Sequence, residues 1–209
     1  GREATVEIIR RSRGQNAADA RMGLERVRVD VQVVGSRATV RADYPNERNS
    51  RYNVSIDYVV TAPAGTRVTI SSVSSDVKVT GVKGELSVGT VSGDVTLTNV
   101  GNLTEAKTAS GDVVVNGAES DGTLEAATLS GDVRLTHVKA RRLQANTVSG
   151  DVTADDVTCE GATLTTMSGD AVFSGPLAKN GRYELSSHSG DGSANVTLTT
   201  FNGDITIKK

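Results

Sequence analysis

The stretch SGDVTLTNVGNLTEAKTASGDV, residues 92–113, contains the unit that decides the fold. It begins and ends on the tetrapeptide SGDV, whose two copies start 18 residues apart, at Ser92 and Ser110. Further SGDV copies start at Ser130 and Ser149, and the variants SIDY, SSDV, SGDA, SGDG and NGDI start at Ser55, Ser74, Ser168, Ser189 and Asn202. Recurrence at intervals of about 19 residues is typical of a repeat protein.

Aligning the copies on their first residue brings apolar side chains to the same positions of each repeat. The third residues after the serine are Val77, Val95, Val113, Val133, Val152 and Ala171, and the fifth are Val79, Leu97, Val115, Leu135, Ala154 and Phe173. A second set lies four residues before the next serine: Val88, Ala106, Ala126, Ala145, Leu164 and Leu185. Alternation at period two between glycine-containing turns predicts short strands. One such unit cannot bury its apolar face alone, so each must stack on its neighbours.

We therefore predict an all-β fold, a single-stranded parallel β-helix (β-solenoid) with about 19 residues per coil, which we expect to be right-handed. Equivalent strands would pair in parallel about 4.8 Å apart. The composition agrees, because 29 Val and 24 Thr favour pleated structure, and aromatic residues make up only 3%. Small aliphatic side chains suit a thin core. The sequence leaves open whether a coil has two strands or three.

Residues 1–54 repeat less regularly and are predicted to form an N-terminal β-rich capping region, continuous with a solenoid over residues 55–209. Alternation predicts strands over residues 4–11, 26–34 and 37–42, and residues 17–27 are predicted to form a short helix. Such a cap would cover the first coil, whose edge strands would otherwise invite pairing with other chains.

The glycine and the aspartate of the motif are predicted to build a structural turn. Glycine allows a left-handed φ or a close backbone approach, and aspartate can accept hydrogen bonds from nearby backbone amides. The turn residues are Gly93, Asp94, Gly111, Asp112, Gly131, Asp132, Gly150, Asp151, Gly169, Asp170, Gly190 and Asp191. Ser75 replaces the glycine in the first clear copy. A second turn is expected in mid-repeat, near Gly84, Gly101, Gly122, Gly161 and Gly181.

Two further columns precede each turn. One contains Thr90, Thr108, Thr128, Thr147 and Thr166, which we expect to stabilise the sheet through contacts between neighbouring strands. The other is mostly apolar and contains Val73, Val91, Ala109, Leu129, Val148 and Met167, with His188 next in line.

A calcium row is an alternative role for the aspartates, on Asp94, Asp112, Asp132, Asp151 and Asp170. Carboxylates stacked one coil apart repel each other by roughly 1 kcal/mol per neighbouring pair in water, which cations would relieve. However, Ca²⁺ takes six to eight oxygen ligands, and each coil offers one reliable carboxylate. We therefore favour the structural turn and expect neither a metal nor a cofactor.

Catalysis has little support in the sequence. The only two histidines, His137 and His188, lack the spacing of metal ligands. His188 is close to Ser189 and Asp191, but serine and aspartate recur in every coil without a histidine, which favours a structural role. One patch could serve an enzyme that acts on anionic polysaccharides: Lys139, Arg141, Arg142, Asp155 and Asp156. We expect no enzymatic activity.

Charge is distributed unevenly along the chain. Residues 1–51 hold eleven Arg, no Lys and seven acidic residues, whereas residues 52–209 hold twelve basic and eighteen acidic residues. The arginines are expected to form a solvated face, with binding to an anionic surface as the alternative. No basic stripe is interleaved with aromatic residues, so nucleic acid is not expected as a partner. The sequence contains no apolar run of 18 residues, so it predicts no transmembrane helix. Its single cysteine, Cys159, cannot form an internal disulfide.

The SGDV array resembles a bacterial family of adhesin-type β-strand-repeat domains, a domain-of-unknown-function family with SGDV repeats. The segments NVSIDYVVTAPAGTRVTISSVSSDV (residues 53–77) and FNGDITIKK (residues 201–209) also resemble it, so the likeness covers residues 25–209. The resemblance implies a β-solenoid in the bacterial periplasm or on the cell surface, exported by a signal or lipoprotein sequence that this sequence lacks. It implies no catalytic residues.

These observations predict a non-enzymatic extracytoplasmic solenoid that acts as an adhesin or as a cell-envelope interaction or spacer domain. The expected partner is an envelope protein or a surface polymer. The first alternative is a self-assembling scaffold whose coil ends stack, as in bactofilin-type β-helices. The second is a β-helix enzyme or binding protein that acts on anionic polysaccharide.

Overall fold

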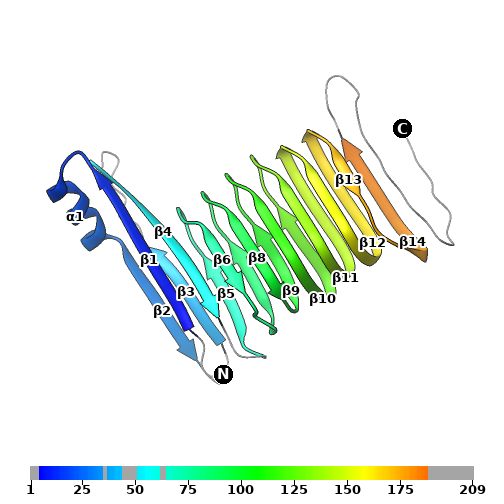
Figure 1. Cartoon of the computed structure of the whole chain (residues 1–209), viewed down its shortest axis with the longest axis horizontal. Helices are drawn as coiled ribbons and strands as arrows, with labels where there is room; N and C mark the ends of the chain where they lie inside the picture. The colour runs from blue at the N-terminus through cyan, green and yellow to red at the C-terminus, as the bar shows by residue number, and fades with distance from the viewer. Residues whose placement is uncertain (1–4, 35–36, 44–50, 62–64, 188–209) are drawn as a thin grey trace.

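The computed structural model describes residues 5–34, 37–43, 51–61 and 65–187. Their strands form one continuous 14-stranded sheet, wound into a parallel β-solenoid of about six turns with roughly 19 residues per coil. Figure 1 shows the result as an elongated rod, with strands side by side along its length and the single described helix at the N-terminal end. The predicted fold class is confirmed.

The sheet has two walls. Wall one contains β4 (Tyr52–Thr61), β6 (Val77–Thr80), β8 (Val95–Val100) and β13 (Ala171–Phe173). Wall two contains β3 (Arg37–Asp43), β5 (Arg67–Ser71), β7 (Leu86–Gly89), β9 (Leu103–Lys107) and β14 (Leu177–Ser187). Three long strands, β10 (Val113–Ala127), β11 (Val133–Ser149) and β12 (Val152–Ser168), run through both walls. Each coil thus contributes one strand to each wall, and parallel bridges between successive motif serines join the walls at the turn.

The register confirms the predicted columns. Val77 pairs with Val95, Val95 with Val113, and the pairing continues through Val133, Val152 and Ala171. These six side chains are at most 1% exposed, and the neighbouring column from Val79 to Phe173 is fully buried. Burial of a Val or Leu side chain contributes roughly 1.5–3 kcal/mol, and the contribution recurs in every coil. The faint SIDY copy lies in the same register, because Tyr58 pairs with Val77.

The N-terminal cap extends both walls by one antiparallel strand. β1 (Thr5–Gly14) pairs with β4, and β2 (Arg28–Val34) pairs with β3. Between them lies α1 (Ala17–Arg26), which begins where the side chain of Asn16 accepts a hydrogen bond from the Asp19 backbone N–H at 2.9 Å. Gly23 lies where the helix meets the sheet, since a Cβ there would come within 2.6 Å of Ser12 Oγ and 2.8 Å of the Tyr52 ring.

The predicted mid-repeat turn is present, because Gly84 lies between β6 and β7, and Gly101 lies with the left-handed Asn102 between β8 and β9. A further left-handed position, which we call the mid-coil corner, precedes this turn in every coil. Left-handed backbone, with φ between 51° and 157°, occurs seven residues after each motif serine, at Gly81, Asn99, Gly117, His137, Asp156 and Gly175. Of the glycines expected to make this turn, none has a left-handed φ. Two of them serve close packing instead: a Cβ on Gly84 would lie 2.1 Å from the Thr66 carbonyl oxygen, and one on Gly101 would lie 2.7 Å from the Lys83 carbonyl oxygen.

Removal of a whole coil should be tolerated. Deleting residues 130–148 joins Leu129 to Ser149 and lets Val152 take the place of Val133 against Val113, so every column stays in phase. We expect this variant to keep its β-sheet circular dichroism and to unfold cooperatively. Deleting residues 130–138 removes half a coil and shifts every later column, so it should abolish the cooperative unfolding transition. Equal behaviour of the two deletions would contradict stacking by register.

Candidate functional site

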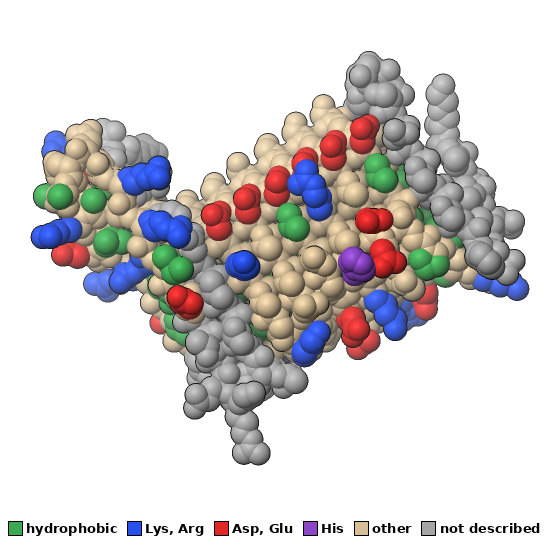
Figure 2. All heavy atoms as spheres, viewed as in Figure 1, with side chains coloured by type: hydrophobic (Ala, Val, Ile, Leu, Met, Phe, Trp, Pro, Cys, Tyr) green, Lys and Arg blue, Asp and Glu red, His purple; other side chains and the backbone are tan. Residues whose placement is uncertain are grey.

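The candidate site is the edge of the rod along which the motif serines, glycines and aspartates stack, which we call the SGD corner. It contains residues 74–76, 92–94, 110–112, 130–132, 149–151 and 168–170. Its aspartates form a row of acidic side chains along the rod, which Figure 2 shows with a basic side chain lying in it. Gly190 and Asp191, together with His188 and Ser189, lie outside the described residues.

The glycine of the corner meets two constraints at once. Its φ lies between 122° and 144° in the five described copies that contain it, a range that side chains rarely adopt. Space is also closed, because a Cβ on Gly150 would lie 2.1 Å from the Gly131 carbonyl oxygen and 2.8 Å from Asp132 Oδ1. Ser75 lacks the left-handed φ, and its buried hydroxyl donates to Ser72 Oγ at 2.5 Å. The first corner therefore has a different shape.

The aspartates form a ladder from coil to coil. The Oδ1 atom of each aspartate accepts a hydrogen bond from the backbone N–H of the aspartate one coil later, at distances between 2.8 and 3.0 Å, from Asp76 through Asp170. In a regular parallel ladder that N–H would bond to the carbonyl of the preceding coil's glycine. The carboxylate replaces this carbonyl, and the resulting charge-assisted bond offsets part of the repulsion within the row.

The threonines satisfy the carbonyl that the aspartate ladder leaves without its usual partner. Thr108, Thr128, Thr147 and Thr166 donate their hydroxyl to the glycine carbonyl of the preceding corner, at 2.8 to 3.0 Å. They are at most 6% exposed, so an unpaired carbonyl here would be costly. Thr147 and Thr166 are paired on neighbouring strands, as predicted, and their hydroxyls bond to the backbone. Threonine and aspartate together satisfy the two backbone groups that the corner would leave unpaired.

One arginine spans the acidic row. Arg134 places Nη1 3.5 Å from Asp112 Oδ2 and Nη2 2.5 Å from Asp132 Oδ2, so a single guanidinium bridges two successive coils. The side chains are 26–50% exposed, and such surface pairs contribute up to about 1 kcal/mol. Asp76, Asp94, Asp151 and Asp170 form no ion pair with any described residue.

The calcium alternative competes with this ladder for the same oxygen atoms. From Asp76 to Asp151, Oδ1 is already an acceptor for a backbone amide, and Arg134 occupies Oδ2 of Asp112 and Asp132. Within the described residues, the structure contains no group of three or more His, Cys, Asp or Glu placed to hold a metal ion. The observed contacts are those of a turn-fixing aspartate.

The charged patch considered for polysaccharide chemistry is split by the mid-coil corner. His137 and Asp156 lie at that corner one coil apart, with Nε2 and Oδ2 at 3.5 Å, and both are 64% exposed. Lys139 and the two arginines come after the corner, and Arg141 pairs with Glu160 at 3.2 Å rather than with Asp155. The sequence reasoning missed this corner. The signal was available, because Gly, Asn, Asp and His are the residues that best tolerate left-handed backbone.

The apolar column that precedes the motif serine points outward. Val73, Val91, Leu129, Val148 and Met167 are 42–58% exposed, and Ala109 is half-buried. We call these six residues the outer apolar row. It lies three positions before the acidic row in every coil, so the two rows run parallel to each other on either side of the turn.

Cys159 lies in the core near the last described coils. It is 4% exposed, and burial raises the pKa of its thiol to about 11. Tyr183 lies beside it, donating its hydroxyl to the Cys159 carbonyl at 2.5 Å and accepting from the Ala178 N–H at 2.9 Å. Burial also raises the pKa of Tyr183. A neutral, buried thiol is a poor nucleophile, so this cysteine serves packing.

A comparison with known protein families finds one whose model matches this repeat region. A family model described as Toastrack DUF4097 matches residues 102–208, just over half of the chain. The chain belongs to the Toastrack DUF4097 family. Toastrack domains occur in bacteria and have no known function. No curated protein and no solved structure matches the chain. Among the described residues of this Toastrack protein, the search for an apolar helix of membrane-spanning length finds none.

Substitution of a corner glycine tests the close packing. We expect Gly150→Ala to lower the free energy of unfolding by about 2–4 kcal/mol, since the new Cβ meets a backbone carbonyl and φ is left-handed. Gly122→Ala is the matched control, because a Cβ there meets nothing within 4 Å and φ is ordinary. Urea unfolding should place the control within about 0.5 kcal/mol of the parent protein. Similar losses in both variants would contradict this account.

A second substitution tests the threonine hydroxyl. Thr166→Val keeps the shape of this fully buried side chain but removes its 2.8 Å bond to the Gly150 carbonyl, so we expect a loss of about 1–3 kcal/mol. The adjacent Thr165 is half-buried on the outer face, and Thr165→Val should change stability by less than about 0.5 kcal/mol. We expect the urea midpoint of the Thr166 variant to fall below those of the Thr165 variant and the parent, with the same dependence of the unfolding free energy on urea concentration. If the Thr166 variant were as stable as the parent, the hydroxyl would not contribute to the stability of the corner.

Proposed function

We propose that this Toastrack domain is a non-enzymatic, rigid interaction or spacer module of the bacterial envelope, located outside the cytoplasm. The observation that carries the proposal is the use of the motif's polar groups. In the described copies the Asp Oδ1 atoms and the Thr hydroxyls bond to the backbone of the next or preceding coil. Their repetition is explained by the fold, without a reaction.

The geometry suits a module that presents side chains at fixed spacing. Continuous parallel pairing along both walls holds each outward row at one residue per coil, about 4.8 Å apart. A partner with a matching repeat, whether an envelope protein or a surface polymer, could contact several coils at once. An adhesin role is one form of this proposal.

A self-assembling scaffold is the second candidate, supported by the opposite charges of the two parts of the chain. Residues 1–51 carry a formal charge of +4 and residues 52–209 carry −6. Charged surfaces of opposite sign on one molecule favour association between copies, and salt screens that attraction.

The location can be tested with the tagged full-length protein in a bacterium that encodes it. We expect protease added to spheroplasts, or to whole cells for a surface protein, to degrade the tagged chain while a cytoplasmic marker survives. Protection of both proteins until the cells are lysed would reject the extracytoplasmic role.

The absence of enzymatic activity is tested separately on anionic polysaccharides. Incubation of the purified domain with a panel of uronic-acid and sulfated polymers should release no oligosaccharide. Product release that disappears in the Arg141→Ala or Asp155→Asn variant would establish a β-helix enzyme instead.

A further inference from the structure

Exposed large hydrophobic side chains fall into two groups in the part of the chain that the structure describes. Five of the eight belong to the outer apolar row, and the other three, Ile9, Met22 and Val31, lie in the N-terminal cap. Single exposed apolar residues are ordinary on protein surfaces. A row that continues over six coils is a contiguous patch, and such patches mark interaction sites.

The acidic row on the other side of the turn already binds one guanidinium, that of Arg134. Arg134 bridges the carboxylates of Asp112 and Asp132, which belong to successive coils. The pairs Asp76 with Asp94, and Asp151 with Asp170, are joined by the same Oδ1-to-amide bond and have the same stacking. Neither pair has an ion-pair partner among the described residues. Each can therefore take a guanidinium from outside in the way that the central pair takes Arg134.

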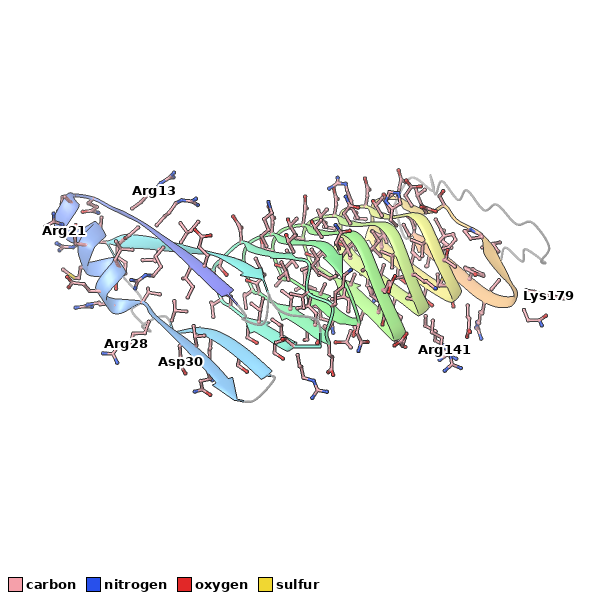
Figure 3. All side chains as sticks on the ribbon, turned by 60° about the horizontal axis from the view of Figure 1, so that its bottom comes forward. Arg13, Arg21, Arg28, Asp30, Arg141 and Lys179 are labelled. Atoms are coloured by element: carbon pink, nitrogen blue, oxygen red, sulfur yellow. The ribbon has the colours of Figure 1, made fainter. Side chains whose placement is uncertain are left out.

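The cap of this same chain offers the complementary surface. Residues 1–51 contain eleven Arg and no Lys, and the chemistry of a bridging guanidinium is specific to arginine. Figure 3 shows Arg13 on β1, Arg21 on α1 and Arg28 on β2 projecting away from the ribbon at the end of the rod. All three are exposed, on the same elements as Ile9, Met22 and Val31. The cap therefore combines exposed arginine with exposed apolar side chains, which complement the acidic row and the outer apolar row.

The cap lies near only the first coil of the SGD corner of its own molecule, where Ile9 pairs with Asp57 and the next residue, Tyr58, pairs with Val77. β1 is paired with β4 over its whole length and β2 with β3 over its whole length, which fixes the cap at one end of the rod. The outer apolar row begins at Val73 and runs away from that end. Contact between the cap and the later coils of the SGD corner therefore requires a second molecule.

We propose that the outer apolar row and the flanking aspartates bind the arginine-bearing N-terminal cap of a second copy of this chain. The inference rests on the proposed interaction role and names a partner for it. Because the two surfaces differ, the contact is heterologous, and each bound copy leaves one cap and one SGD corner unoccupied. Association therefore continues into chains of copies, and salt weakens it by screening the ion pairs.

Two variants change the cap and the outer apolar row one at a time. The cap variant carries Arg13→Glu, Arg21→Glu and Arg28→Glu, and the row variant carries Leu129→Ser, Val148→Ser and Met167→Ser. Every changed side chain is exposed, so circular dichroism and thermal midpoint should stay near those of the parent. A control variant, Lys139→Glu, Arg141→Glu and Arg142→Glu, makes the same charge change after the mid-coil corner.

The measurement is molar mass by light scattering over a range of protein concentrations, at low salt and at high salt. We expect the parent and the control variant to form oligomers whose mass rises with concentration and falls with salt. The cap variant and the row variant should each associate at least roughly tenfold more weakly, since each has one defective surface. Mixed in equal amounts they should form a one-to-one complex, because each supplies the surface that the other lacks.

Several outcomes would overturn the proposal. A parent protein that stays monomeric at every concentration would do so, as would a row variant that associates like the parent or a mixture that forms no complex. Binding of a monomeric parent to phosphatidylglycerol vesicles, lost in the cap variant alone, would assign the arginines to an anionic membrane. These results are independent of the spheroplast experiment: a monomer outside the cytoplasm rejects copy-to-copy docking alone, and a cytoplasmic oligomer rejects the envelope role alone.

Discussion

The structure depends on one recurring hydrogen bond, from the backbone N–H of a motif aspartate to the carboxylate of the aspartate one coil before it. A left-handed glycine turns the chain at this point and breaks the regular parallel ladder. The aspartate supplies an acceptor for the amide, and a threonine hydroxyl supplies a donor for the glycine carbonyl. With both groups satisfied, successive coils keep the same register through the turn, and the buried columns stay aligned.

That constraint also determines the surface. Since every coil turns at the same residue, the side chains on either side of the turn stack into rows at the spacing of paired strands. One row is apolar and exposed, and the next is acidic, with Arg134 bridging two of its members. The polar groups that hold the fold and the side chains that face solvent thus come from the same few residues of each repeat. This is why a motif that looks functional in the sequence has a structural task, while the residue before it carries the exposed apolar row.

Much of this could be predicted from the sequence. The spacing of the SGDV copies placed Val77, Val95 and Val113 in one buried column, and the residues expected to form strands in the cap do so in β1, β2 and β3. The mid-repeat turn near Gly84 and Gly101 was predicted, but the left-handed position that precedes it was not, because glycine was taken as the marker of a turn. Asn99, His137 and Asp156 adopt the left-handed backbone instead, while Gly84 and Gly101 allow close approach of coils.

The sequence by itself determined the solenoid, the coil length and the identity of the buried columns, because an apolar position that repeats every coil can be buried only if the coils stack. Only the tertiary structure decided which polar groups meet, since Thr147 and Gly131, or Asp132 and Asp151, are 16 and 19 residues apart and become neighbours only through winding. It also decided that the column from Val73 to Met167 faces outward. Alternation along a strand separates two faces but does not say which one lies inside when both sides of a turn carry apolar residues.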